Sequence, residues 1–467
     1  MTTFSSLVYQ NTNGGEEMAG SAGNSNNSAQ STSYADHDCR ISKENLYMVL
    51  ALHMQEFPGE PRIGDYKKVG AVLVLPSEML YAVDCSRDGV HGVARLLMAH
   101  PETARDCKVF VSRKPCSFCT KLLVQSKVKR VFYLPIEPEY WRENDFVAET
   151  SRVDNLFKVS SIGQSVFVPR VGQEVTDTFK RKKETRKKET DTKTLQTEID
   201  KKTKELQGKI MRKYWRKDRW IKIAQSKLPW PAFDVKMKAQ VHKDFQSVAK
   251  WMAHVLIESE IGDSFEALTR KKSKSFDPCR NDLERRQAIH LMKLAFFLAE
   301  RTDDPRKGVG AVIINRDKDI VGLGWNGFPT KSLYGEFPRA ADKDLPVGCR
   351  DDKKYPYIIH AEQNALLLRN TNNIVDSTLI VTMTPCDECT PLIEMQGIET
   401  VVLGEKRRED GSRPQMKFTK FPQSSLVCFQ PATQIQKKRT ADSGGTGGKA
   451  DSSSEKTKGP GVKRLRY

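Results

Sequence analysis

The chain has 467 residues, of which 38% are hydrophobic and 29% charged, so two or three domains with disordered segments beside them are expected. It has no apolar run of about eighteen residues and no charged start followed by an apolar core, so neither a membrane span nor a secretory signal is expected. Its ten cysteines lack a compact disulfide spacing, which favours metal ligands in a reducing compartment. The formal charge of +18 is compatible with nucleic-acid binding, but most of it lies outside the predicted folded units.

The first folded unit is predicted at 41–170, after a segment at 1–40 that is rich in Ser, Asn and Gly and is expected to be disordered. Apolar spacing predicts alternating helices and strands in this unit. In chain order we expect a helix from Lys43, strands at 69–75 and 79–83, a helix at 93–98, a strand at 108–112, a helix from Lys114 and a strand at 131–134. This order predicts an α/β unit.

The same order recurs about 240 to 270 residues later, which predicts two copies of one α/β unit, copy 1 at 41–170 and copy 2 at 236–432. The sequence Val-Gly-Ala-Val at 69–72 repeats at 309–312. His91 precedes Cys116 by 25 residues, and His360 precedes Cys386 by 26. The change in spacing predicts a polar, loop-like insertion of about 29 residues in copy 2, before His360.

Two charged segments flank copy 2. The linker at 171–235 is predicted to be a solvated helix or a disordered connector. Within it, 211–220 interleaves aromatic and basic residues, either as a nucleic-acid-binding segment or, in the favoured interpretation, as an amphipathic helix packed on a neighbouring domain. The tail at 433–467 is predicted to be disordered, and its basic clusters at 437–439 and 463–466 resemble a bipartite nuclear localisation signal. A nuclear import receptor is therefore an expected partner, and nucleus and cytoplasm are the expected locations.

Copy 2 carries His-x-Glu at His360 and Glu362, followed by Pro-Cys-x-x-Cys from Pro385 to Cys389. One His and two Cys are ligands that zinc prefers, and they leave its fourth position for water. Cys386 and Cys389 are one helical turn apart, so both thiolates can face one ion. A redox cysteine pair or a structural zinc clip would leave Glu362 and Pro385 unexplained. The pattern is that of zinc-dependent deaminases, in which the Glu moves protons and is not a ligand.

Copy 1 retains His91, Cys116 and Cys119 at matching spacing, which favours a second zinc site over a decayed copy kept only for its core. Val93 stands where Glu362 stands in copy 2. Because valine cannot move a proton, copy 1 is expected to be catalytically inactive. Its expected role is structural or regulatory, including assembly or the binding of a nucleotide without turnover.

The sequence at 322–327 matches the Gly-x-Gly-x-x-Gly of dinucleotide-binding sites. That reading needs a helix to begin there, whereas a polar loop follows from Phe328, so we reject it. We interpret the segment as a strand end that delivers Asn326 to the pocket. Ser86, at the matching position of copy 1, lacks the longer amide. Further along, Pro391 is expected to kink the helix that begins near the cysteine pair.

Copy 2, from about 283 to 405, resembles the deoxycytidylate deaminase family. The resemblance rests on Asp-Pro at 304–305, Gly-Trp-Asn-Gly-Phe-Pro at 324–329, His-Ala-Glu-Gln-Asn-Ala at 360–365 and Thr-Pro-Cys-x-x-Cys at 384–389. It implies a three-layer α/β/α fold around a mixed sheet, with Zn2+ as cofactor and a free deoxycytidine nucleotide as substrate, dCMP or, as we favour, dCTP. The residues it implies are His360, Cys386 and Cys389 for zinc, Glu362 for proton transfer, and Asn326 and Ala361 for substrate binding.

Two other functions stay open: a deaminase of DNA or RNA, which the same zinc pattern supports, and a non-enzymatic nucleotide-binding scaffold. The Gly-Trp-Asn-Gly-Phe-Pro sequence and the intact Glu362 favour the free-nucleotide enzyme. Nucleic acid and membranes are therefore not expected as partners, and a homo-oligomer is expected because deaminases of this fold usually assemble. Which residues bind the phosphates is not fixed by the sequence, and the candidates are Lys331, Arg339, Lys343 and Arg350.

Overall fold

The computed structural model describes residues 41–59, 67–139, 146–169, 171, 193–215, 235–259, 261–268, 275–304, 307–329, 337–338, 352–404 and 425–431. Several predictions lie outside the described residues. These are the disorder at 1–40 and 433–467, the nuclear localisation signal, the four candidate phosphate-binding residues and most of the insertion in copy 2.

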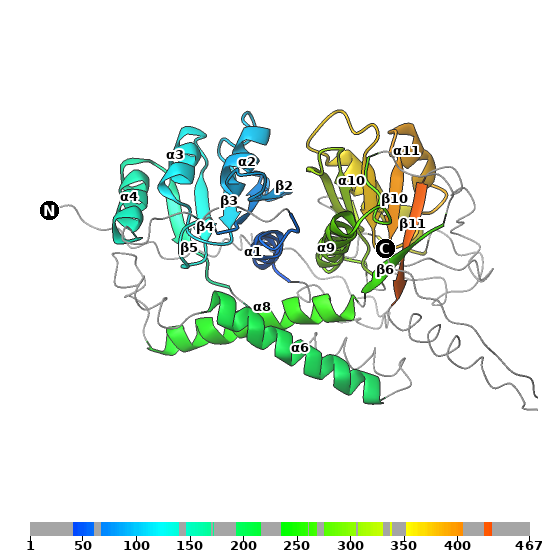
Figure 1. The fold of residues 1–467 in the computed structure, drawn as a ribbon, viewed down its shortest axis with the longest axis horizontal. Coiled ribbons are helices and arrows are strands. Elements are labelled where there is room, and N and C mark those ends of the chain that lie inside the picture. The colour runs from blue at the N-terminus through cyan, green and yellow to red at the C-terminus, as the bar shows by residue number, and fades with distance from the viewer. Residues whose placement is uncertain are drawn as a thin grey trace, which may run out of the picture. The chain divides into compact units, whose positions relative to one another are not determined.

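Copy 1 is built around a five-stranded mixed sheet with the strand order β2-β1-β3-β4-β5 (Figure 1). The strands are β1 (Gly70–Val74), β2 (Leu80–Cys85), β3 (Lys108–Val111), β4 (Arg130–Tyr133) and β5 (Gly163–Val166). Strand β1 pairs antiparallel with β2 and β3, whereas β3, β4 and β5 run parallel. The helices are α1 (Lys43–Met54), α2 (Gly92–Ala99), α3 (Ser117–Gln125) and α4 (Phe146–Val159).

Copy 2 repeats this plan with one extra strand, in the order β6-β11-β10-β9-β7-β8. The strands are β6 (Ile261–Ala267), β7 (Gly310–Ile314), β8 (Ile320–Trp325), β9 (Thr378–Val381), β10 (Thr400–Leu403) and β11 (Ser425–Pro431). Strand β7 is antiparallel to β8 and β9, the run β9-β10-β11 is parallel, and β6 closes the edge antiparallel to β11. The described helices after β6 are α9 (Asp282–Ala299), the 3-10 helix η4 (Tyr355–Tyr357), α10 (Ala361–Leu367) and α11 (Cys389–Met395).

Interior strands of both sheets, among them β1 and β7, are buried along their whole length. In β1, Val72 and Val74 pack in one cluster with α1, while Ala71 and Leu73 pack in another with α2. A strand covered on both faces has a continuous apolar sequence. This is why β1 could be predicted from the apolar run at 69–75. The predicted fold class, two copies of a three-layer α/β/α unit with a mixed central sheet, is confirmed.

The linker contributes helix α6 (Lys193–Tyr214), which packs against α8 (Val235–Glu258). Just after α6, the ring of Trp215 lies 4.9 Å from that of His242 and 5.1 Å from that of Phe245 on α8, measured between centroids. Tyr214 is buried. Of the two structures predicted for the linker, 193–214 adopts the helix. The aromatics Tyr214 and Trp215 are packed as the favoured interpretation of 211–220 expects, whereas 216–220 lie outside the described residues.

A buried contact joins α1 of copy 1 to α9 of copy 2. The rings of His53 and His290 stack with centroids 3.7 Å apart and an interplanar angle of 8°. The edge of Phe297 meets His53 at 5.2 Å. All three side chains are buried, and residues of both copies share one apolar cluster there. This packing ties the two copies together through their cores.

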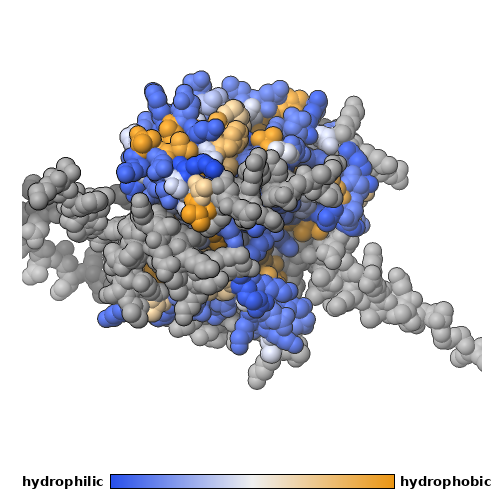
Figure 2. Space-filling view, turned by 60° about the vertical axis from the view of Figure 1, so that its left-hand side comes forward, coloured by the Kyte–Doolittle hydropathy of each residue, from blue (hydrophilic) through white to orange (hydrophobic). Residues whose placement is uncertain are grey.

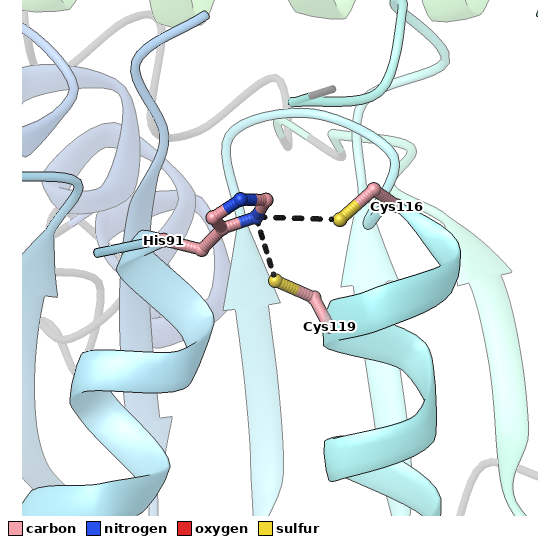
Figure 3. A group of neighbouring side chains, drawn as sticks. All are labelled: His91, Cys116 and Cys119. Atoms are coloured by element: carbon pink, nitrogen blue, oxygen red, sulfur yellow. Dashed lines mark hydrogen bonds between the residues drawn. The ribbon is translucent and has the colours of Figure 1, made fainter. Parts of the chain in front are cut away.

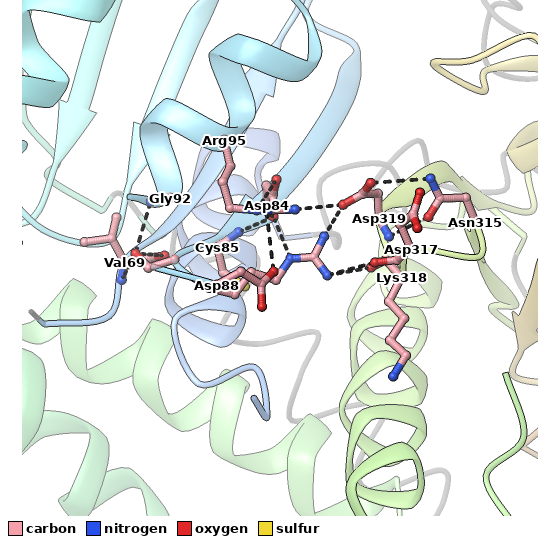
Figure 4. A network of polar contacts seen from close by, with 12 residues as sticks. Val69, Asp84, Cys85, Asp88, Gly92, Arg95, Asn315, Asp317, Lys318 and Asp319 are labelled. Atoms are coloured by element: carbon pink, nitrogen blue, oxygen red, sulfur yellow. Dashed lines mark hydrogen bonds and ion pairs between the residues drawn. The ribbon is translucent and has the colours of Figure 1, made fainter. Parts of the chain in front are cut away.

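A polar network adds to this contact at the surface (Figure 4). Asp319, just before β8, accepts hydrogen bonds from Arg87 and from Arg95, the latter at 2.8 Å. Arg95 also pairs with Asp84 of β2 at 3.3 Å. Asp319 is 41% exposed, whereas Arg87, Arg95 and Asp84 are only 12 to 19% exposed. The network therefore links β2 and α2 of copy 1 to the segment before β8 of copy 2.

The face shown in Figure 2 is mostly polar: most of its described residues are hydrophilic, with hydrophobic ones scattered among them. Among the described helices, none is both long and apolar enough to cross a membrane. Some large apolar side chains are nevertheless well exposed, including Leu367 at the end of α10 and Met395 at the end of α11.

Candidate metal centres and active site

Each copy brings one His and two Cys together, with their ligand atoms within 4.8 Å of one another. In copy 2, His360 Nδ1 lies 3.2 Å from Cys389 Sγ and 3.3 Å from Cys386 Sγ. In copy 1, His91 Nδ1 lies 3.3 Å from Cys116 Sγ and 3.4 Å from Cys119 Sγ, as Figure 3 shows. The His and Cys residues that are spaced alike in the two copies thus form two clusters of side chains in the structure.

Helix ends position the three ligands of copy 2. His360 precedes α10, and its backbone N–H donates to Gln363 Oε1 at 2.9 Å, which fixes the start of the helix. Cys386 follows β9, and α11 begins only at Cys389. Pro391 is therefore in the first turn of α11, where a backbone N–H has no partner within the helix, so the predicted kink is wrong.

The two donor sets fit zinc. In a tetrahedral site with Zn–N of about 2.0 Å and Zn–S of about 2.3 Å, neighbouring ligand atoms lie roughly 3.5 Å apart. The distances from the His nitrogen to the Cys sulfurs, 3.2 to 3.4 Å, come close to that value. The contact between the two cysteines lowers the pKa of Cys386 to about 4 and raises that of Cys389, so Cys386 is the ligand that is a thiolate before metal binds.

Glu362 is the second residue of α10 and is 4% exposed. Burial raises the pKa of Glu362 to about 7, an effect that His360 weakens and Cys386 adds to. A carboxyl group with its pKa near neutrality can both accept and return a proton. Val93, at the corresponding place on α2, is a buried core residue, and copy 1 has no acid at that position.

Asn326 lies directly beside the metal ligands in the fold. Gly327 and Ile359, the neighbours of Asn326 and His360, form a two-residue β-bridge with hydrogen bonds of 2.8 and 3.0 Å. The amide of Asn326 is buried, and its Oδ1 accepts from the Val309 N–H at 2.7 Å. The structure thus brings Asn326 to the site.

Ala361, the other residue expected to bind substrate, opens α10 and is fully buried. Its side chain belongs to the apolar cluster of copy 2. The roles of Ala361 and Asn326 in substrate binding stay predictions.

The glycines at 322 and 324 have a packing role. An added Cβ at Gly324 would lie 2.3 Å from the Ala361 carbonyl oxygen and 2.5 Å from the Ala365 nitrogen. One at Gly322 would lie 2.7 Å from the Ala365 carbonyl oxygen. These glycines let α10 approach β8 closely, and the residues after them form a bridge and not a helix, which agrees with the rejection of a dinucleotide-binding site.

We expect Gly324→Ala to lower the free energy of unfolding by about 1–3 kcal/mol or more, because the backbone of α10 must shift. The shift should also move His360 and weaken zinc binding. Denaturant titration and zinc competition would measure both effects. Gly208→Ala on α6 is the matched control: its Cβ would meet only Arg212 at 3.4 Å, so stability should be unchanged or rise by about 1 kcal/mol. Equal destabilisation by the two variants would contradict this packing role.

Sequence reasoning missed two buried polar contacts. Lys354 forms an ion pair with Asp304, both less than 10% exposed, and Asp304 lies 3.3 Å from the Asn326 amide nitrogen. In copy 1, Glu139 is 1% exposed, with Oε2 3.1 Å from His91 Nδ1. No local motif marks Lys354 or Glu139, because each meets its partner only through the fold.

Comparison with known proteins agrees with this geometry. Residues 285–405 match the family model described as the cytidine and deoxycytidylate deaminase zinc-binding region. A zebrafish (Danio rerio) protein named cytidine and dCMP deaminase domain-containing protein 1 is 26% identical over 411 residues, which cover 78% of this chain and 83% of that protein.

Two phage proteins are also similar. The deoxycytidylate deaminase of Mycobacterium phage D29 is 35% identical over 123 residues, which cover 24% of this chain and 90% of that protein. The structure of the cyanophage S-TIM5 dCMP deaminase in complex with dCMP and dUMP is 26% identical, covers 26% of this chain and 81% of that one, and gives a TM-score of 0.22. With a His-Cys-Cys cluster in each copy and a buried Glu beside the second, this chain belongs to the zinc-dependent cytidine and deoxycytidylate deaminase family.

Proposed function

We propose that copy 2 catalyses the hydrolytic deamination of a free deoxycytidine nucleotide: water replaces the amino group on the base, giving the deoxyuridine nucleotide and ammonia. The observation that carries this proposal is the buried Glu362 beside the cluster of His360, Cys386 and Cys389. Membership of the deaminase family makes a zinc-dependent hydrolase acting on a cytosine nucleotide the function of first choice. The scaffold alternative would leave the buried acid without a use.

The residues have distinct roles in this reaction. His360, Cys386 and Cys389 would hold zinc, which supplies Lewis acidity that makes water a better nucleophile near neutral pH. Glu362 takes one proton from the attacking water, whose oxygen bonds to C4, and passes that proton to N3 of the base. Glu362 then takes the second proton from the new C4 hydroxyl and gives it to the amino nitrogen, so that the C–N bond breaks, ammonia leaves and the C4 carbonyl forms.

Asn326 and Ala361 are proposed to line the substrate pocket next to the metal ligands, with the Asn326 amide contacting the sugar hydroxyl. The hydrogen bonds of Asn326 to Val309 and to the Lys307 carbonyl support this, because they hold the amide in one orientation. We propose dCTP as the preferred substrate and dCMP as the other choice. The basic residues in the insertion of copy 2 support a site for several phosphates.

We further propose that copy 1 is catalytically inactive, since Val93 offers no proton-transfer group. A homo-oligomer is proposed from the usual assembly of deaminases of this fold, and the exposed Leu367 and Met395 near the ends of α10 and α11 support it. Import into the nucleus through the basic tail, alongside a cytoplasmic pool, is a proposal from the sequence alone.

Ammonia release from a substrate series tests the function. Purified zinc-loaded protein would be given cytidine, deoxycytidine, dCMP, dCDP, dCTP and a cytosine-containing single-stranded DNA or RNA. We expect turnover of a phosphorylated deoxycytidine and none of the oligonucleotides. Turnover of an oligonucleotide alone, with binding that weakens steeply as salt rises, would replace this proposal with a polynucleotide deaminase. Ammonia from none of them, with zinc bound, would favour the scaffold.

A further inference from the structure

A buried carboxylate stands at the metal cluster of copy 1. Glu139 lies in the segment after β4 and is 1% exposed. Its Oε2 is 3.1 Å from His91 Nδ1 and 3.8 Å from Cys119 Sγ. It therefore contacts two of the three side chains shown in Figure 3.

These distances are those expected between ligands of one ion. In a tetrahedral zinc site, O···N and O···S separations of roughly 3.3 and 3.5 Å follow from bond lengths of about 2.0 to 2.3 Å. The two sulfurs lie 3.3 and 3.4 Å from His91 Nδ1, and Glu139 offers a further donor at the side of the cluster that His91 and Cys119 form. We propose that Glu139 is a fourth zinc ligand in copy 1, and that it closes this site to water and to substrate.

A second contact holds the carboxylate in place. Ser86 donates a hydrogen bond to Glu139 Oε1 and accepts from the backbone N–H groups of Val69 at 2.9 Å and Gly92 at 3.1 Å. Outer-sphere hydrogen bonds of this kind orient metal ligands. Ser86 occupies the position of Asn326, so the residue expected to face substrate in copy 2 faces a ligand carboxylate in copy 1.

The closed site differs from a catalytic one in a defined way. Catalytic zinc keeps one position open for water or substrate, whereas structural zinc has four protein ligands. With Glu139 in the fourth position and Val93 in place of an acid, copy 1 has neither the open position nor the proton carrier. The ion in copy 1 would then stabilise the fold by linking α2, α3 and the segment after β4. This inference does not depend on the substrate of copy 2.

Cobalt(II) in place of zinc tests the proposal, because its visible spectrum reports coordination. The full-length Cys389→Ser variant would serve as background, so that the metal in copy 1 is observed alone. We expect a tetrahedral spectrum that azide does not change. In Glu139→Ala the spectrum should become sensitive to azide, and zinc affinity should fall by at least about 10–100-fold, the loss typical of outer-sphere partners.

Two further variants separate ligation from a general structural role. Glu139→Cys offers a third thiolate, and we expect it to restore zinc affinity and to raise the sulfur-to-cobalt charge-transfer absorbance. Glu137→Ala removes a carboxylate two residues earlier and should leave both readouts unchanged. An azide-sensitive spectrum in the background protein, or equal zinc affinity with and without the Glu139 carboxylate, would overturn the proposal.

Discussion

The Cys389→Ser variant is expected to form the deoxyuridine nucleotide on the order of 10³-fold more slowly than the wild type, or slower still. Cys389 is fully buried, and its sulfur is 3.2 Å from His360 Nδ1. Serine is a poorer zinc ligand, and Lewis-acid stabilisation by the metal is worth several kcal/mol, with each 1.36 kcal/mol counting for about tenfold in rate. Initial rates with dCMP and dCTP, measured with the zinc content of the same samples, would test this.

Zinc content gives this prediction its control. The Cys389→Ser protein should lose about one zinc per chain and keep the ion of copy 1. Cys279→Ser, which replaces an exposed cysteine before α9, should keep both the zinc and the rate. Unchanged turnover in Cys389→Ser would show that the cluster of copy 2 is not the reaction centre.

Acid should weaken the contact between the two copies through its histidine pair. Burial lowers the pKa of His53 from 6.5 to about 4. Burial also lowers the pKa of His290 well below its usual value, and the neighbouring His53 adds to this effect. The unfolded chain therefore takes up protons first as pH falls. The full stability is present above pH 6.5 and is lost as pH falls toward 4. At pH 5 the loss from His53 alone is about 2 kcal/mol.

The charged groups around the pair do not reverse this direction. Lys293 on α9 and Lys68 before β1 disfavour protonation further, and Glu56 after α1 opposes them only in part. Denaturant unfolding at pH 7 and pH 5 would measure the loss, and His53→Phe should show a smaller difference between the two pH values. His254→Phe on α8, outside the α1–α9 contact, is the control. A pH dependence that His53→Phe leaves intact would assign the acid sensitivity to other groups.

The interior strands β1 and β7 could be predicted because burial on both faces leaves a continuous apolar run. The edge strand β5, Gly-Gln-Ser-Val at 163–166, has only half-buried residues and no such run. It is held by parallel pairing with β4, which no local pattern reveals. Helix α6 carries charged residues along most of its length. Its packing on α8 is, like the pairing of β5 with β4, a tertiary contact that no local sequence pattern reveals.

The metal ligands could be predicted because helix starts bring residues at fixed spacing to one point. His360 and Cys389 stand at such starts, Cys386 lies in the turn before α11, and the three are recognised by their fixed spacing in the sequence. Glu139 could not be predicted, since it is 20 residues beyond Cys119 and reaches the cluster from the segment after β4. Contacts between residues far apart in the sequence determine whether a zinc site has an open position, and they become visible only in the folded structure.

The most direct test of the central claim is the rate of deoxyuridine nucleotide formation by Glu362→Gln. Glutamine keeps the size of the side chain but cannot carry the proton, so we expect a loss of about 10²–10⁴-fold with zinc content unchanged. Glu388→Gln, an exposed carboxylate beside the ligand Cys389, should keep the wild-type rate. A Glu362→Gln protein that turns over dCMP or dCTP as fast as the wild type would contradict the account.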